Sequence, residues 1–177
     1  MLELLAPAGN LDAVIAAVQN GADAVYMGFG DGFNARRSAD NFTRESFAKA
    51  VRYCHIRGCK VYVTLNTLVG DREMDVAAAL AQQASDAGAD AILVQDLGLA
   101  RVLRAALPDI PLHASTQMSI HNLAGVEAAA EMGITRAVLA RELSLEQIRF
   151  ISQHASIETE VFVHGALCFC YSGQCYM

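Results

Sequence analysis

The chain has 177 residues, of which 54% are hydrophobic and 18% are charged, so it has enough apolar material to bury the core of one domain. This composition excludes an intrinsically disordered protein. The formal net charge is −6 and Lys and Arg form no run, so the chain offers few of the cationic contacts that bind the phosphate backbone of a nucleic acid. The first residues, MLELLAPAGN, lack the basic segment of a signal peptide, and no apolar stretch reaches the roughly 20 residues that span a bilayer. We therefore expect a cytoplasmic protein without a membrane segment.

Short, near-continuously apolar runs alternate with segments of helical periodicity along the whole chain. The predicted strands are Leu2–Ala6, Ala24–Gly28, Lys60–Leu65, Ala91–Val94, Pro111–Ser115, Arg136–Ala140 and Ile157–Val163. The predicted helices are Leu11–Asn20, Arg44–Arg57, Arg72–Ala87, Leu99–Ala106, Ala124–Met132 and Leu145–His154. Three helix starts carry capping residues: Thr43 with Ser46, Asp71, and Ser144 with Gln147.

Three helix-to-strand joints repeat a weak pattern, NGADAVYMG, AGADAILVQ and MGITRAVLA, in which a glycine ends the helix and a buried strand follows. Repeated strand–helix–strand units with short joints imply right-handed parallel crossovers. Seven such strands favour an α/β fold of the (β/α)8 TIM-barrel type, truncated after the seventh strand, so that residues 1–177 form a single incomplete barrel domain. The alternative is an open doubly wound sheet, but PAGN after the first strand lacks the GxGxxG loop typical of that fold.

Polar side chains that directly follow the predicted strands are the candidate site residues, because a barrel enzyme works at the carboxyl ends of its strands. We expect catalytic roles for His164, Arg141, Glu142 and Asn66. We expect substrate binding by Asn34, Arg36, Ser115, Gln117, His121 and Asn122. Arg36 and Arg141 carry the planar guanidinium that suits a carboxylate or a phosphate. The alternative interpretation is that some of these residues, with Asn10, Thr67 and Asp96, serve only as turn formers and helix caps.

The five cysteines fall into two groups. Cys54 and Cys59 lie at the end of a predicted helix and the start of a predicted strand, where a buried cysteine behaves as a small hydrophobic residue. Cys168, Cys170 and Cys175 crowd one glycine-containing loop with the spacing C-x-C-x₄-C. That spacing is neither the pattern of a zinc finger nor that of a bacterial ferredoxin. A metal site, a reactive thiol and simple packing all remain open on spacing alone.

The final stretch, EVFVHGALCFCYSGQCYM, resembles the signature of the collagenase-like peptidases, family thirty-two of the peptidases of unknown catalytic type. The segments ELLAPAGN, NGADAVYMG, FNAR, VYVTLNTL, LHASTQMSIHN and LARELSL fit the same family, so the resemblance covers essentially the whole chain.

The resemblance implies two activities and a third role. Some family members are iron–sulfur proteins that support hydroxylation of uridine in transfer RNA, cytidine in ribosomal RNA or the ubiquinone ring. In those members a [4Fe–4S] cluster is held by the signature cysteines and by two later ones, which implies Cys168 and Cys175 as ligands here and Cys170 as a neighbour. The implied oxygen source is prephenate, whose carboxylates Arg36 or Arg141 would hold. A peptidase would instead use the Cys168 thiolate with His164 as base, and the third alternative is a non-catalytic partner subunit.

Taken with the resemblance, the chain is expected to be the N-terminal part of a longer enzyme, and we favour hydroxylation of an RNA base or an aromatic ring for that enzyme. We expect the 177-residue chain alone to be inactive and to lack an intact [4Fe–4S] cluster. RNA or a small aromatic substrate would bind through the missing C-terminal part. Unpaired edge strands pair with other chains, so the open barrel edges at Leu2–Ala6 and Ile157–Val163 predict a dimer, an exchange of elements between copies, or a disordered C-terminal loop from about Gly165 onward.

Overall fold

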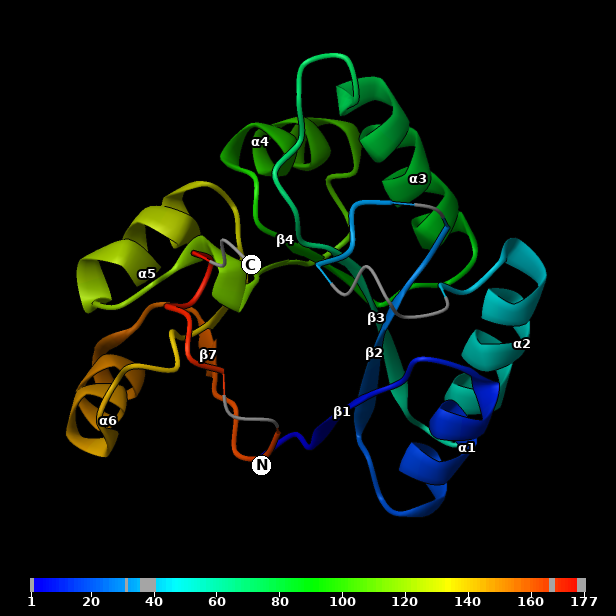
Figure 1. Cartoon of the computed structure of the whole chain (residues 1–177), viewed down its shortest axis with the longest axis horizontal. Helices are drawn as coiled ribbons and strands as arrows, with labels where there is room; N and C mark the ends of the chain where they lie inside the picture. The colour runs from blue at the N-terminus through cyan, green and yellow to red at the C-terminus, as the bar shows by residue number, and fades with distance from the viewer. Residues whose placement is uncertain (1, 31, 36–40, 166–167, 175–177) are drawn as a thin grey trace. The chain divides into compact units, whose positions relative to one another are not determined.

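The computed structural model describes residues 2–30, 32–35, 41–165 and 168–174, and strands and helices alternate along them (Figure 1). The strands are β1 (Leu5–Pro7), β2 (Ala24–Gly28), β3 (Lys60–Leu65), β4 (Ala91–Val94), β5 (Leu112–Ala114), β6 (Arg136–Val138) and β7 (Glu158–Glu160). The helices are α1 (Leu11–Gln19), α2 (Arg44–His55), α3 (Met74–Asp86), α4 (Leu97–Ala106), α5 (Leu123–Glu131) and α6 (Leu145–His154), with a short 3₁₀ helix η1 (Thr116–Met118).

The strands form one sheet in sequential order, β1-β2-β3-β4-β5-β6-β7. The pairs β1–β2, β2–β3, β5–β6 and β6–β7 are all parallel. A doubly wound sheet reverses its strand order at a switch point, whereas a (β/α)8 barrel adds each strand beside the previous one. The sequential parallel order therefore confirms the predicted fold class. By contact the chain divides into two compact units, residues 1–93 and 94–177.

The first unit has its core between the buried strands β2 and β3 and the inner faces of its helices. Phe47 of α2 is fully buried and its ring lies 4.7 Å from that of Phe29, centroid to centroid. Helix α3 contributes a stripe of buried alanines, Ala77, Ala81 and Ala84, at helical spacing. Small side chains on that face let the helix approach closely. Truncation of a buried aromatic such as Phe47 to Ala typically costs about 3–5 kcal/mol.

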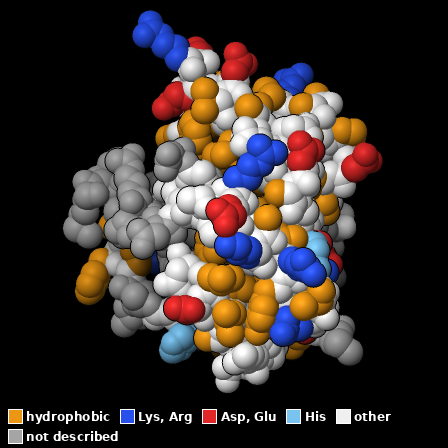
Figure 2. Space-filling model, turned by 90° about the vertical axis from the view of Figure 1, so that its right-hand side faces the viewer, with side chains coloured by type: hydrophobic (Ala, Val, Ile, Leu, Met, Phe, Trp, Pro, Cys, Tyr) orange, Lys and Arg blue, Asp and Glu red, His pale blue; other side chains and the backbone are white. Residues whose placement is uncertain are grey.

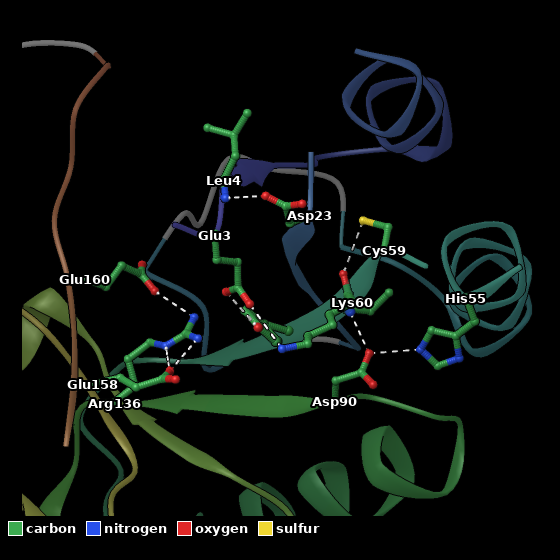
Figure 3. A network of polar contacts seen from close by, with 12 residues as sticks. Glu3, Leu4, Asp23, His55, Cys59, Lys60, Asp90, Arg136, Glu158 and Glu160 are labelled. Carbon is green, nitrogen blue, oxygen red and sulfur yellow. Dashed lines mark hydrogen bonds and ion pairs between the residues drawn. The ribbon is translucent and has the colours of Figure 1, made fainter. Parts of the chain in front are cut away.

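Polar contacts fasten the N-terminal residues of the first unit to β2 and β3 (Figure 3). The Tyr62 hydroxyl donates to one carboxylate oxygen of Glu3 (2.9 Å), and Lys60 Nζ donates to the other (3.1 Å). Asp90 Oδ2 accepts from the backbone N–H of Val61 (2.7 Å) and lies 2.9 Å from His55 Nε2. These carboxylates tie the amino ends of neighbouring strands together.

The second unit buries every residue of β5 and β6. Arg136, the first residue of β6, has a side chain that is only 10% exposed and pairs with both glutamates of β7 (Figure 3). Its Nη2 lies 2.6 Å from Glu158 Oε2, and its Nη1 lies 3.5 Å from Glu160 Oε2. A buried guanidinium needs such partners, since an uncompensated buried charge is strongly destabilising. Glu158 and Glu160 therefore stabilise Arg136 and also join β6 to β7.

Most predicted elements match the structure within one or two residues, and β2, β3, β4 and α6 match residue for residue. Two predicted strands, the first and the last, differ from the structure by three residues at one end. The first begins at Leu5, since Leu2 and Leu4 are exposed, and the last ends at Glu160, where the Leu139 N–H makes the final bond to that strand. The segment 161–163 continues as an exposed, apolar, non-strand stretch.

The predicted caps are confirmed at two of three helices. Thr43 accepts from the Ser46 N–H, and Ser144 with Gln147 forms a full capping box. Asp71 was the wrong choice for α3, which begins after Glu73 without a side-chain cap. The glycines of the repeated joints have the left-handed φ that such helix ends require (Gly21 91°, Gly88 97°, Gly133 81°).

In the described part of the chain no helix is long and apolar enough to cross a membrane.

Candidate functional site

Polar residues of the second unit gather where β5 ends. Ser115 is buried and begins η1, its hydroxyl accepting from the Gln117 N–H at 3.3 Å. The 3₁₀ helix ends at Ser119, which has a left-handed φ of 58°. A non-glycine residue rarely adopts this conformation, and residues held in it cluster at functional sites. Asn122 then begins α5, and its side chain accepts from the Gly125 N–H at 2.8 Å.

His121 lies between this turn and the residues that follow β6. Its Nδ1 is 2.5 Å from the Ser119 carbonyl oxygen, and its Nε2 is 3.4 Å from Glu142 Oε2. A carbonyl oxygen only accepts hydrogen bonds, so Nδ1 must carry hydrogen. That leaves Nε2, facing the carboxylate, as the nitrogen that can gain or lose a proton.

The residues 168–174, which we call the cysteine loop, dock onto Arg141 and Glu142 through Ser172 (the loop is drawn in red in Figure 1). The Ser172 N–H and hydroxyl both donate to Glu142 Oε1, at 2.8 and 3.2 Å. The Ser172 oxygen accepts from the backbone N–H and from Nε of Arg141, each at 3.2 Å. The Ser119 hydroxyl donates to the Ser172 carbonyl. One serine, 1% exposed, therefore connects three segments that are far apart in sequence.

Arg141 lies beside the Cys168 thiol. Its Nη2 donates to the Cys170 carbonyl at 3.0 Å. The hydrogen bond from the Arg141 guanidinium is the largest of the effects that lower the pKa of the Cys168 thiol from its ordinary value. Because Cys168 is also exposed, it has the two properties of a reactive or ligating cysteine.

Glu142 is held in its charged form by the same loop. Partial burial raises the pKa of the carboxyl, but hydrogen bonds from the N–H and hydroxyl of Ser172 outweigh this effect, so the pKa of Glu142 is lowered. The site thus places a guanidinium, a carboxylate, an imidazole and an exposed thiol on adjoining segments of the second unit.

The first unit carries the candidate amide residues. Asn34 is buried and donates through Nδ2 to Asn41 Oδ1 at 3.1 Å, while Asn66 Oδ1 accepts from the Ala35 N–H at 3.1 Å. A methyl group on Gly28 would lie 2.3 Å from Asn34 Nδ2 and 2.1 Å from Asn41 Oδ1, so the amide pair packs directly on the end of β2. These contacts show a local structural role for both candidates, and substrate binding by Asn34 and catalysis by Asn66 stay predictions.

The structure brings together some of the predicted site residues and not others. Arg141, Glu142 and His121 are assembled around the cysteine loop, and Ser115 and Gln117 lie in the adjoining turn. His164 is exposed and has no hydrogen-bond partner in the described part of the chain. Arg36 and Cys175 lie outside the described residues.

Sequence reasoning missed Ser119 and Ser172, which make the contacts that dock the cysteine loop. Serine occurs in any loop, so its residue type carried no signal. Adjacency to a glycine within the dense cysteine motif was the one available indication for Ser172.

A cluster needs more thiolates than the described residues bring together. Among them no group of three His, Cys, Asp or Glu side chains is arranged to hold a metal ion. Among the described cysteines, Cys168 is exposed and has a lowered pKa, which favours the thiolate that binds a metal, and Cys170 follows it two residues later. The expected lack of a cluster in this chain remains a prediction.

The distribution of charged side chains bears on how a nucleic acid could bind. On the face shown in Figure 2, Lys and Arg side chains are interspersed with Asp and Glu side chains. The formal net charge is −6, and the expectation that another part of the protein binds the RNA backbone stays a prediction.

Comparison with known proteins identifies the class. The sequence pattern of peptidase family U32 matches residues 9–177, and the chain belongs to this family. The chain is 45% identical over 176 residues to the 23S rRNA 5-hydroxycytidine C2501 synthase of Escherichia coli (strain K12), covering 99% of this chain and 26% of that protein. It is 41% identical over 175 residues to tRNA hydroxylation protein P1 of Bacillus subtilis (strain 168), with 99% and 41% covered.

The family also contains proteins named as proteases. A protein named collagenase, from Porphyromonas gingivalis (strain ATCC BAA-308 / W83), is 34% identical over 187 residues, covering 99% of this chain and 44% of that protein. Among solved structures, the U32 peptidase Mk0906 superposes with a TM-score of 0.75 at 18% identity, covering 91% of this chain and 68% of that one, which bears on the fold alone. The chain thus spans less than half the length of these three relatives.

Proposed function

We propose that the protein is an RNA-hydroxylating enzyme that depends on an iron–sulfur cluster and acts on a pyrimidine base, with a ribosomal cytidine as the favoured substrate. The observation that carries this proposal is the 45% identity to the 23S rRNA 5-hydroxycytidine C2501 synthase across 99% of the chain. The next relative, at 41% identity, is also named for RNA hydroxylation. We propose the cytoplasm as the location of the protein, since that is where the RNA substrate would be met.

Cys168 and Cys175 would hold a [4Fe–4S] cluster, together with two further cysteines of the complete protein. Such a cluster supplies one-electron transfer when bound. Arg141 supports this assignment because it stabilises the thiolate form of Cys168, the form in which cysteine binds iron. Ser172 holds Arg141 through two hydrogen bonds, so the guanidinium is positioned before any ligand arrives.

Hydroxylation replaces a C–H bond of the base with C–OH, which is a two-electron oxidation. The bond between the donor and its oxygen breaks, the donor keeps that electron pair and is thereby reduced, and a base takes the proton of the C–H bond. His121 Nε2, paired with the Glu142 carboxylate, is our candidate proton acceptor. Prephenate is our candidate donor, and Arg141 is the described cation that would bind its carboxylates. The amides of Gln117 and Asn122, both in the second unit, offer donors and acceptors for the edge of an unpaired base.

The test is made with the complete protein in cells whose own RNA hydroxylase genes have been deleted. Digested ribosomal and transfer RNA would be analysed by mass spectrometry, and we expect 5-hydroxycytidine in ribosomal RNA. Purification under anaerobic conditions should give a brown protein with stoichiometric iron and sulfide. A colourless protein that leaves both RNA pools unmodified would overturn the proposal.

A peptidase is the second candidate, supported by the relative named collagenase. The exposed Cys168 with its lowered pKa would be the nucleophile. A base must lie within about 2.6–3.2 Å of that nucleophile, and Arg141 rather than a histidine is the leading cause of the shift in the pKa of Cys168. Cleavage of gelatin by the purified protein, lost in Cys168→Ala and unaffected by iron chelation, would favour this activity.

A further inference from the structure

Ser172 is the point at which the cysteine loop meets the rest of the second unit. Its side chain is 1% exposed, and its hydroxyl and backbone groups bond to Arg141, Glu142 and Ser119. A buried hydroxyl with this many partners is costly to remove, because each partner is left unsatisfied. The bonds to Arg141 engage its backbone N–H and its Nε, so they fix both the start and the head of that side chain.

Gly173 allows this docking through a close approach of two backbones. Its φ is 77°, and a Cβ atom added there would lie 2.2 Å from the Gln117 carbonyl oxygen and 2.5 Å from Ser119 Oγ. Contacts this short do not occur, so any side chain at residue 173 would push the loop off η1. The glycine is required here by space as well as by conformation.

We propose that Ser172 and Gly173 form a latch that positions the cysteine loop, holding Arg141 and the backbone of Cys170 together so that Cys168 lies beside the guanidinium. The role of the latch in retaining iron rests on the proposed function. The contacts that form the latch do not depend on that function. Ser172 and Gly173 are positioning residues: they act on iron retention through Arg141 and the loop.

The chain offers a matched control for each residue. Ser156 donates its N–H and its hydroxyl to the carboxylate of Glu127, at 2.9 and 2.6 Å, as Ser172 does to Glu142, but it does not belong to the cysteine loop. Gly58 has a φ of 72°, and a Cβ atom there would meet nothing within 4 Å. Ser156→Ala thus controls for losing a serine–glutamate contact, and Gly58→Ala controls for strain at a left-handed residue.

The first measurement is amide hydrogen exchange at Arg141 and Ser172 in the complete protein. Ser172→Ala should speed exchange at Arg141 about tenfold, since the Arg141 N–H loses the hydroxyl oxygen that accepts its hydrogen bond. Gly173→Ala should speed exchange at both positions by more than that, because the whole loop undocks. Ser156→Ala and Gly58→Ala should leave both rates within about twofold of the unsubstituted protein. Rates in the latch variants that match those of their controls would overturn the latch.

The second measurement is loss of iron to a chelator after anaerobic loading with iron and sulfide. Residues that orient a metal ligand typically change metal affinity by about 10–100-fold, so Ser172→Ala should lose iron at least about tenfold faster than Ser156→Ala. Faster exchange without faster iron loss would overturn the positioning role and leave only a structural contact. If the unsubstituted protein takes up no iron, the proposed function fails, and the exchange measurement still decides on the latch by itself.

Discussion

The cysteines Cys54 and Cys59 on the one hand, and Cys168 on the other, have opposite environments. Cys54 lies in the last turn of α2 and Cys59 directly before β3, and they are 0% and 3% exposed. Burial is the main cause that raises the pKa of Cys54 to about 12. Cys168 is exposed, and the neighbouring guanidinium lowers its pKa. The same functional group is thus an inert core filler in one unit and an ionisable site residue in the other. Location after a strand at the carboxyl edge, rather than residue type, decides the chemistry.

The largest expected effect is on iron content when a ligand is removed. In the complete protein, Cys168→Ala and Cys175→Ala should reduce iron, sulfide and the hydroxylated nucleoside to background, because a cluster loses an anchoring thiolate. Cys170→Ala should keep most of the activity. The matched control is Cys59→Ala, which removes a buried thiol and should retain full iron content. An equal loss in all three loop variants would point to a ligand set that includes Cys170.

A thiol-reactivity measurement compares the two groups without any cofactor. At pH 8 the thiolate fraction of Cys54, with a pKa of about 12, should be roughly a thousandfold below that of a thiol at the ordinary value of 9.0. The pKa of Cys168 lies below 9.0, so its rate of alkylation by iodoacetamide should exceed that of Cys54 by at least this factor. Peptide mass spectrometry over time would measure both rates. Comparable rates would mean that the native state exposes the helix–strand pair.

The buried pair shows what could be predicted from sequence. Cys54 and Cys59 are flanked by apolar residues at helical and strand spacing, and burial follows from that pattern. The same reasoning found β2, β3 and β4 residue for residue, because strands covered on both faces read as continuous apolar runs. The same reasoning predicted β1 and β7 too long, because the apolar sequence there extends beyond the residues whose backbone hydrogen bonds define the strand.

The cysteine loop shows what could not be predicted. The position of Arg141 and Glu142 after a strand predicted that they belong to a site, and the structure places both against the loop. Nothing local in the sequence relates them to Ser172 or Ser119. The bonds that Ser172 makes join residues 30 or more positions apart, in segments outside the regular helices and strands. Asn122 could be predicted either as a helix cap or as a substrate-binding residue, because asparagine suits both roles. The structure shows the cap at the start of α5, and substrate binding stays a prediction.

A stability measurement should separate the two groups by about 1 kcal/mol. Cys54→Ala removes a fully buried sulfur and should lower the free energy of unfolding by about that amount, as small core deletions do. Cys168→Ala removes an exposed side chain and should change it by no more than about 0.5 kcal/mol. Urea midpoints of the two variants give the comparison. A larger loss in Cys168→Ala would show that the loop contributes to global stability.

The smallest expected effect is an acid-induced loosening confined to the cysteine loop. The pKa of Glu142 is lowered below its ordinary value of 4.5, so its bonds to Ser172 contribute stability that is fully present above pH 4.5 and is lost as the pH falls through the lower folded value. The Ser172 amide signal in ¹H–¹⁵N spectra should therefore titrate with a midpoint below 4.5. Glu142→Gln should abolish that titration, while the Ser156 amide, bound to Glu127 whose pKa is lowered by hydrogen bonds from Ser156, should titrate as before. A midpoint above 4.5 at Ser172 would mean that burial outweighs the hydrogen bonds, and the loop would then be held by Arg141 and η1 alone.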